Sequence, residues 1–127
     1  MNAYAAMKQY QTVNVNAQVS EADPHRLIQM LMEGGLQRIA QAKGAMQHGN
    51  LALKGEQIGK AVAIIGGLRE SLDHQQGGEV AGNLERLYAF MQQRLSEANL
   101  RNDVALLDEV IDLLREVKAG WDGIRQS

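Results

Sequence analysis

The sequence predicts an all-α fold: an antiparallel up-down four-helix bundle with a short N-terminal arm or helix. Apolar residues recur at steps of three and four in four successive stretches, which is the spacing of one buried face of a helix. Short connections separate these stretches, and helices joined in this way pack as antiparallel neighbours. We therefore expect an arm at residues 1–19 and one bundle domain at residues 20–127.

The composition fits one domain with a modest aliphatic core. Of the 127 residues, 45% are apolar but only 4% are aromatic, so Leu, Ile, Val, Ala and Met must fill the core. The net charge is −2 and the Lys and Arg residues are scattered, which argues against nucleic acid as a partner. There is no cysteine and no apolar run long enough to cross a bilayer, so we expect a cytoplasmic protein that does not insert into membranes.

The N-terminal arm is polar apart from a few apolar positions at helical spacing. Tyr4, Met7 and Tyr10 recur at three-residue steps, which predicts a short amphipathic segment that docks reversibly on an apolar surface. A frayed terminus is the alternative interpretation. The first bundle helix then begins at an Asp23 cap followed by Pro24, both typical of a helix start, and runs to about His48. Its predicted core face comprises Ile28, Leu31, Gly35, Ile39, Ala42 and Met46.

The second and third helices are separated by a pair of glycines. We expect the second helix to run from Ala52 or Lys54 to His74, and the third from Glu79 to about Asn99, with Gly77-Gly78 as the break between them. The predicted core face of the second helix is Ile58, Ala61, Val62, Ile65, Leu68 and Leu72. That of the third is Val80, Leu84, Leu87, Met91, Leu95 and Ala98.

The fourth helix carries the clearest pattern in the chain. Asn102 or Asp103 should cap it, and its core face comprises Leu107, Val110, Leu114, Val117, Trp121 and Ile124. Leu106, Ile111 and Leu113 widen the apolar surface beyond what a bundle helix needs. Apolar surface left over after packing indicates an interaction site, which the N-terminal arm or a second copy of the chain would otherwise cover.

Thirteen glycines are unusual for an all-helical chain, because each one inside a helix costs roughly 1 kcal/mol relative to alanine. Two interpretations are open: close approach of neighbouring helices, or a bundle soft enough to repack around a partner. The glycines expected inside helices are Gly34, Gly35, Gly59, Gly66, Gly67 and Gly82.

The sequence offers no support for an enzyme, a metal site or a cofactor. Di-metal bundles use Glu-x-x-His pairs on two helices, and none occurs here; Glu70 and His74 are four residues apart and lack further ligands. A histidine phosphotransfer or signalling module is the alternative function for a small helical bundle. Such a module needs an exposed mid-helix histidine followed closely by Lys-Gly, whereas Lys54-Gly55 follows His48 only after a Gly-Asn break.

Motifs across the chain resemble the flagellin-specific export chaperones of the FliS family. They are AYAAMKQYQ at residues 3–11, ADPHRLIQML at 22–31, SLDHQQGGEVAGNLERLYAFM at 71–91, Leu95 with Ala98-Asn99 and Asp103, and the closing helix with its tryptophan. Their order and spacing are those of the family. One departure is Met32, which stands where the family usually has an aromatic residue.

The resemblance implies a cytoplasmic chaperone that binds the disordered C-terminal region of flagellin, prevents its premature polymerisation and delivers it to the flagellar type III export gate. It also implies that the arm covers part of the binding surface when flagellin is absent. Met7 and Tyr10 match the arm positions that dock on the export gate.

For the flagellin-binding groove we predict four residues from the helical pattern: Ile58, Ile65, Leu106 and Leu113. This assignment assumes that the second and fourth helices are neighbours. The implied partners are therefore the flagellin C-terminal segment and a component of the export gate, with a homodimer as a further expectation.

Overall fold

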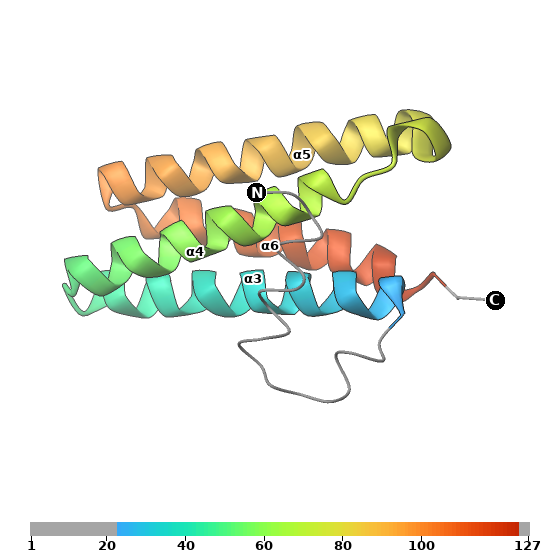
Figure 1. Cartoon of the computed structure of the whole chain (residues 1–127). Helices are drawn as coiled ribbons and strands as arrows, with labels where there is room; N and C mark the ends of the chain where they lie inside the picture. The colour runs from blue at the N-terminus through green and yellow to red at the C-terminus, as the bar shows by residue number, and fades with distance from the viewer. Residues whose placement is uncertain (1–22, 125–127) are drawn as a thin grey trace.

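The computed structural model describes residues 23–124 as four long helices, labelled α3 to α6 in Figure 1. They are α3 (Pro24–Gln47), α4 (Leu51–Glu70), α5 (His74–Arg101) and α6 (Val104–Asp122). Successive helices run in opposite directions, which confirms the predicted antiparallel bundle (Figure 1). The expected arm at residues 1–19, and with it Met7 and Tyr10, lies outside the described residues.

Polar side chains define the start of each helix, as the sequence indicated for two of them, α3 and α6. Asp23 caps α3 by accepting a hydrogen bond of 2.8 Å from the Arg26 backbone N–H. Asn50 caps α4, and Asp103 caps α6. Each of these side chains accepts from a backbone N–H of the first turn, where the helix itself supplies no acceptor.

The connection between α4 and α5 differs from the prediction. Helix α4 ends at Glu70 rather than at His74, because the Asp73 carboxylate accepts from the backbone N–H groups of Gln75 and Gln76 and so starts a new helix there. The glycine break is confirmed as a kink inside α5, where Gly78 has φ 51° and ψ −122°. That conformation is open to glycine and strained for other residues.

Each helix packs mainly against two others, α3 and α5 each lying between α4 and α6. Helices α4 and α6 are therefore diagonal across the bundle, and the assumption that they are neighbours is wrong. The physical reason is the up-down topology, in which consecutive helices are adjacent and alternate helices are opposite.

The core lies along the middle of all four helices and is mostly aliphatic. Its fully buried large side chains are Leu31, Met32, Ile39, Ile65, Leu68, Met91, Leu95, Leu107, Val110 and Leu114. Met32, the departure from the family pattern, therefore fills core space, as a flexible thioether does readily. Tyr88 is also buried, and burial raises its pKa to about 12.

Two residues assigned to the core face lie at the surface instead. Val80 is 66% exposed and Ile124 is 50% exposed. Val80 has the helical phase of Met91, but it lies only two residues after the kink at Gly78 inside α5.

Close approach of neighbouring helices explains some of the helix glycines but not others. A Cβ atom built on Gly35 would lie 3.3 Å from Leu114 Cδ2 and 3.6 Å from Ile64 Cγ2, so α3 approaches its neighbours closely at this point. Gly59, in contrast, faces open space. Close packing thus accounts for Gly35 and not for Gly59.

Candidate functional site

The structure separates the four residues predicted for the groove into two pairs. Ile58 and Ile65 are 3% and 0% exposed and belong to the central core. They offer no surface to a partner in this conformation, which corrects their assignment to a groove. Leu106 and Leu113 are half-buried on α6 and pack against the edge of the core.

An ion pair between α5 and α6 fixes the level at which these leucines lie. Arg94 Nε on α5 is 3.0 Å from Glu109 Oε1 on α6. Leu106 and Leu113 lie three residues before and four residues after Glu109, and such positions share one side of a helix. The two leucines therefore flank the ion pair on the side of α6 that faces α5.

The Arg94–Glu109 pair also sets which residues of α5 and α6 lie at the same level, and one of them is an aromatic residue that the sequence analysis did not assign to the site. Because α5 and α6 are antiparallel, the residue one turn before Arg94 on α5 lies at the same level as the residue one turn after Glu109 on α6. Those positions are Phe90 and Leu113. Phe90 is 36% exposed, although phenylalanine is among the residues most often buried.

We call this strip, made of Phe90, Arg94, Leu106, Glu109 and Leu113, the α5–α6 seam. The sequence carried a signal for Phe90: it is the only phenylalanine of the chain and lies one position away from the apolar face that includes Met91. The seam has half-buried aliphatic side chains and an exposed ring, with one charged pair between them.

Arg94 of the seam also belongs to a chain of charge pairs along α5. Arg94 Nη1 donates to Glu97 Oε2 at 3.1 Å, and Arg101 Nη1 donates to Glu97 Oε1 at 3.0 Å. Hydrogen bonds from Arg101 and then Arg94 hold the pKa of the Glu97 carboxyl below its usual range.

The paired atoms Arg94 Nε and Glu109 Oε1 are themselves shielded from solvent, although the two side chains are 32% and 40% exposed. Their geometry is that of an ion pair rather than of an aligned hydrogen bond.

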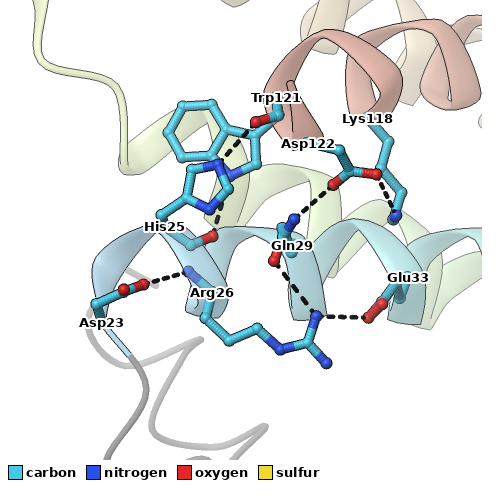
Figure 2. A network of polar contacts seen from close by, with 8 residues as sticks. All are labelled: Asp23, His25, Arg26, Gln29, Glu33, Lys118, Trp121 and Asp122. Carbon is cyan, nitrogen blue, oxygen red and sulfur yellow. Dashed lines mark hydrogen bonds and ion pairs between the residues drawn. The ribbon is translucent and has the colours of Figure 1, made fainter. Parts of the chain in front are cut away.

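The opposite side of α6 is closed by polar contacts with α3, shown in Figure 2. The rings of His25 and Trp121 stack with centroids 4.8 Å apart and an interplanar angle of 12°. His25 Nε2 lies 2.7 Å from the Trp121 carbonyl oxygen and donates to it, and Trp121 Nε1 donates in return to the His25 carbonyl at 3.0 Å. We call this reciprocal contact the His25–Trp121 clasp.

The three histidines lie at helix ends: His25 in the first turn of α3, His48 at the C-cap of α3 and His74 at the first position of α5. His48 Nδ1 is 2.8 Å from the Gly44 carbonyl. The phosphotransfer alternative needs a mid-helix histidine, and His48 does not meet that requirement.

None of the helices within residues 23–124 combines the length and the apolar character that a membrane-spanning helix needs. Nor does that range contain three or more His, Cys, Asp or Glu side chains grouped so that they could hold a metal ion.

Comparison with known proteins gives a family match over nearly the whole chain. The model of the family described as flagellar protein FliS matches residues 6–127. The flagellar secretion chaperone FliSB of Pseudomonas aeruginosa is 64% identical over 124 residues, which is 98% of each chain. The flagellar secretion chaperones FliS of Vibrio cholerae and Salmonella typhimurium are 46% and 40% identical, covering 94% and 98% of this chain and 88% and 93% of theirs.

These relatives are described as chaperones, which is not an enzyme class. The motifs behind the resemblance lie within the matched range, except that the first one begins at Ala3, three residues before that range. The chain therefore belongs to the FliS family of flagellar secretion chaperones.

Proposed function

We propose that this chain acts in the cytoplasm, binds the C-terminal segment of flagellin, prevents that segment from polymerising early and delivers it to the flagellar type III export gate. The family supports a role in flagellar secretion. The observation that carries the binding role is the α5–α6 seam, where half-buried leucines and an exposed ring lie together on a well-packed bundle.

The seam suits an amphipathic helical client. A client segment of this kind presents an apolar face that can lie along two bundle helices, as in other helix-in-groove complexes. Because the client is disordered when free, it loses conformational entropy on binding and must cover a large surface to reach useful affinity. Leu106 and Leu113 are thus retained from the predicted groove, and Phe90 joins them.

The test is a double substitution, Leu106→Lys with Leu113→Lys. It should abolish binding of the flagellin C-terminal segment in isothermal titration while leaving the melting curve nearly intact, because half-buried lysine stems can reach solvent. Leu51→Lys with Leu100→Lys is the matched control: it makes the same change at leucines that are 61% and 87% exposed away from the seam, and it should bind normally.

Unimpaired binding by the seam variant would move the site elsewhere, and gross unfolding would return both leucines to the core. A second copy of the chain could cover the same leucines, so light scattering of the free protein belongs in the same experiment. A homodimer that the seam variant disrupts would show that the seam also serves self-association.

Delivery to the gate is tested separately through the arm. The Met7→Ala, Tyr10→Ala variant should bind flagellin as well as the parent or slightly better, because an arm that docks weakly would no longer compete for the groove. Flagellin secretion and swimming should nevertheless fall. A loss of flagellin affinity of tenfold or more would place the arm in the client site and remove the gate assignment for this chain.

A further inference from the structure

We infer that Arg94 is a movable cover over Phe90, and that the client gains access to the ring only when the guanidinium leaves it. This deepens the proposed binding role and rests on it: it names the residue that regulates access to the seam. The geometry is local to one face of α5, since Phe90 and Arg94 are one turn apart.

The guanidinium lies over the ring. Arg94 Cζ is 4.9 Å from the centroid of Phe90, a cation–π distance. The cover is incomplete, because Phe90 remains 36% exposed. An apolar group approaching Phe90 from solvent therefore meets the arginine as a competitor for the same face.

The arginine does not depend on the ring to stay in place. Its Nη1 donates to Glu97 and its Nε pairs with Glu109, so two carboxylates anchor it from opposite sides of the seam. A long side chain with several rotatable bonds can move off the ring and keep a carboxylate partner. The guanidinium is thus tethered near Phe90, where it can cover and uncover the ring without losing its charge partners.

The cover is weak enough to be displaced. A cation–π contact at an exposed site, and a surface ion pair, are each equivalent to no more than about fivefold in an equilibrium constant. Burying an aromatic ring under an apolar side chain of a helical client is worth more than that. We therefore expect the client's apolar residue to replace the arginine on the ring at the level of Leu113.

A double-substitution cycle on Phe90 and Arg94 tests the cover. Isothermal titration with the flagellin C-terminal segment should show about two- to fivefold tighter binding for Arg94→Met, because the tethered guanidinium no longer covers the ring. Phe90→Ala should weaken binding at least tenfold. In the Phe90→Ala background, Arg94→Met should have no further effect, since a cover with no ring beneath it is irrelevant.

Arg101→Met is the matched control. Arg101 lies on the same helix and donates to the same Glu97, but no cation–π contact places it over Phe90, so its removal should leave affinity unchanged. The salt dependence of binding provides a second readout. High ionic strength should reduce the difference in affinity for the flagellin segment between the parent and Arg94→Met, because salt weakens the ion pairs that hold the guanidinium near the ring. Phe90→Leu serves as the ring variant if Phe90→Ala unfolds.

Three outcomes would overturn the inference. If Arg94→Met weakens binding in both backgrounds, Arg94 is itself a client contact and not a cover. If Phe90→Ala or Phe90→Leu binds normally, the ring is not in the client site, although the proposed function survives through the leucines. If the parent protein itself does not bind the flagellin segment, the proposed function fails and the cover fails with it.

Discussion

Helix α6 has two flanks, and the bundle holds them in different ways. The flank toward α3 is fastened at its end by the His25–Trp121 clasp, in which two rings stack and each residue donates to the other's carbonyl. Gln29 Nε2 of α3 adds a hydrogen bond of 2.7 Å to Asp122 Oδ1. These contacts are directional, so they fix both the distance and the rotation of α6 relative to α3.

The flank toward α5 is joined across the α5–α6 seam by the Arg94–Glu109 ion pair, above half-buried leucines. Ion pairs of partly exposed side chains tolerate movement and contribute little to stability. The difference shows that directional contacts can hold a helix on one side while its other side stays accessible to a partner. A partner that binds at the seam leaves the anchored flank untouched.

The largest expected effect separates the centre of α6 from its seam side. Leu114→Ala should lower the free energy of unfolding by about 2–5 kcal/mol, because it removes a fully buried side chain from the core. Leu113→Ala, one residue away and half-buried, should cost about 1 kcal/mol. Urea melts of both variants make the measurement, and equal losses would mean that Leu113 is core and the seam is closed.

The anchored flank should show the next largest effect. Trp121→Phe keeps a ring against His25 but removes the Nε1 donor, which should cost roughly 1 kcal/mol of unfolding free energy. A cycle with His25→Ala should reveal coupling of about 0.5 kcal/mol or more, since the two side-chain rings stack on one another. Strict additivity of the two single changes would show that the clasp contributes no joint stability.

The seam ion pair should matter less to stability. Arg94→Met should change the free energy of unfolding by less than about 1 kcal/mol, and the change should shrink as salt is added. The loss of unfolding free energy could instead equal that of Trp121→Phe and persist at high salt. That result would show that the flank toward α5 is held as firmly as the flank toward α3.

The smallest effect concerns pH at the anchored flank. Hydrogen bonds from Lys118 and then Gln29 lower the pKa of Asp122 below its ordinary value of 3.8. Its contribution to stability is therefore present above the unfolded-state pKa and is lost as pH falls through the lower folded-state pKa. The stability advantage of the parent over Asp122→Asn should shrink as pH is lowered below about 4, when followed by urea melts; an advantage that stays constant there would show that Asp122 is not held by these donors.

Much of the fold was predictable because helix starts and faces are local properties. The Asp23 and Asp103 caps and the three-and-four spacing around Leu114 depend on a few neighbouring residues, so the sequence specifies them directly. The predicted end of the second helix at His74 was wrong because Asp73 caps the next helix. Val80 was missed because periodicity gives the phase of a residue but not whether a neighbour reaches it.

The candidate site was less predictable. Periodicity placed Leu106 and Leu113 beside the core face of their helix, which the structure bears out. It could not tell which helices are adjacent, and so Ile58 and Ile65 were placed at a groove when the diagonal arrangement buries them. Phe90 acquires its place only through the register that Arg94 and Glu109 set between two helices, and such a register is a long-range property.

The clasp has a mechanical consequence. An even number of antiparallel helices brings Asp23 and Ile124, the limits of the described chain, to the same end of the bundle, where His25 and Trp121 stack (Figures 1 and 2). Tension applied between the two ends would pull α6 away from α3 in an unzipping direction, and would load this contact before any contact further along the bundle. The force needed to open the molecule from its ends is therefore set first by one stacked pair of rings and two hydrogen bonds, while the core around Leu114 bears load only after that pair has parted.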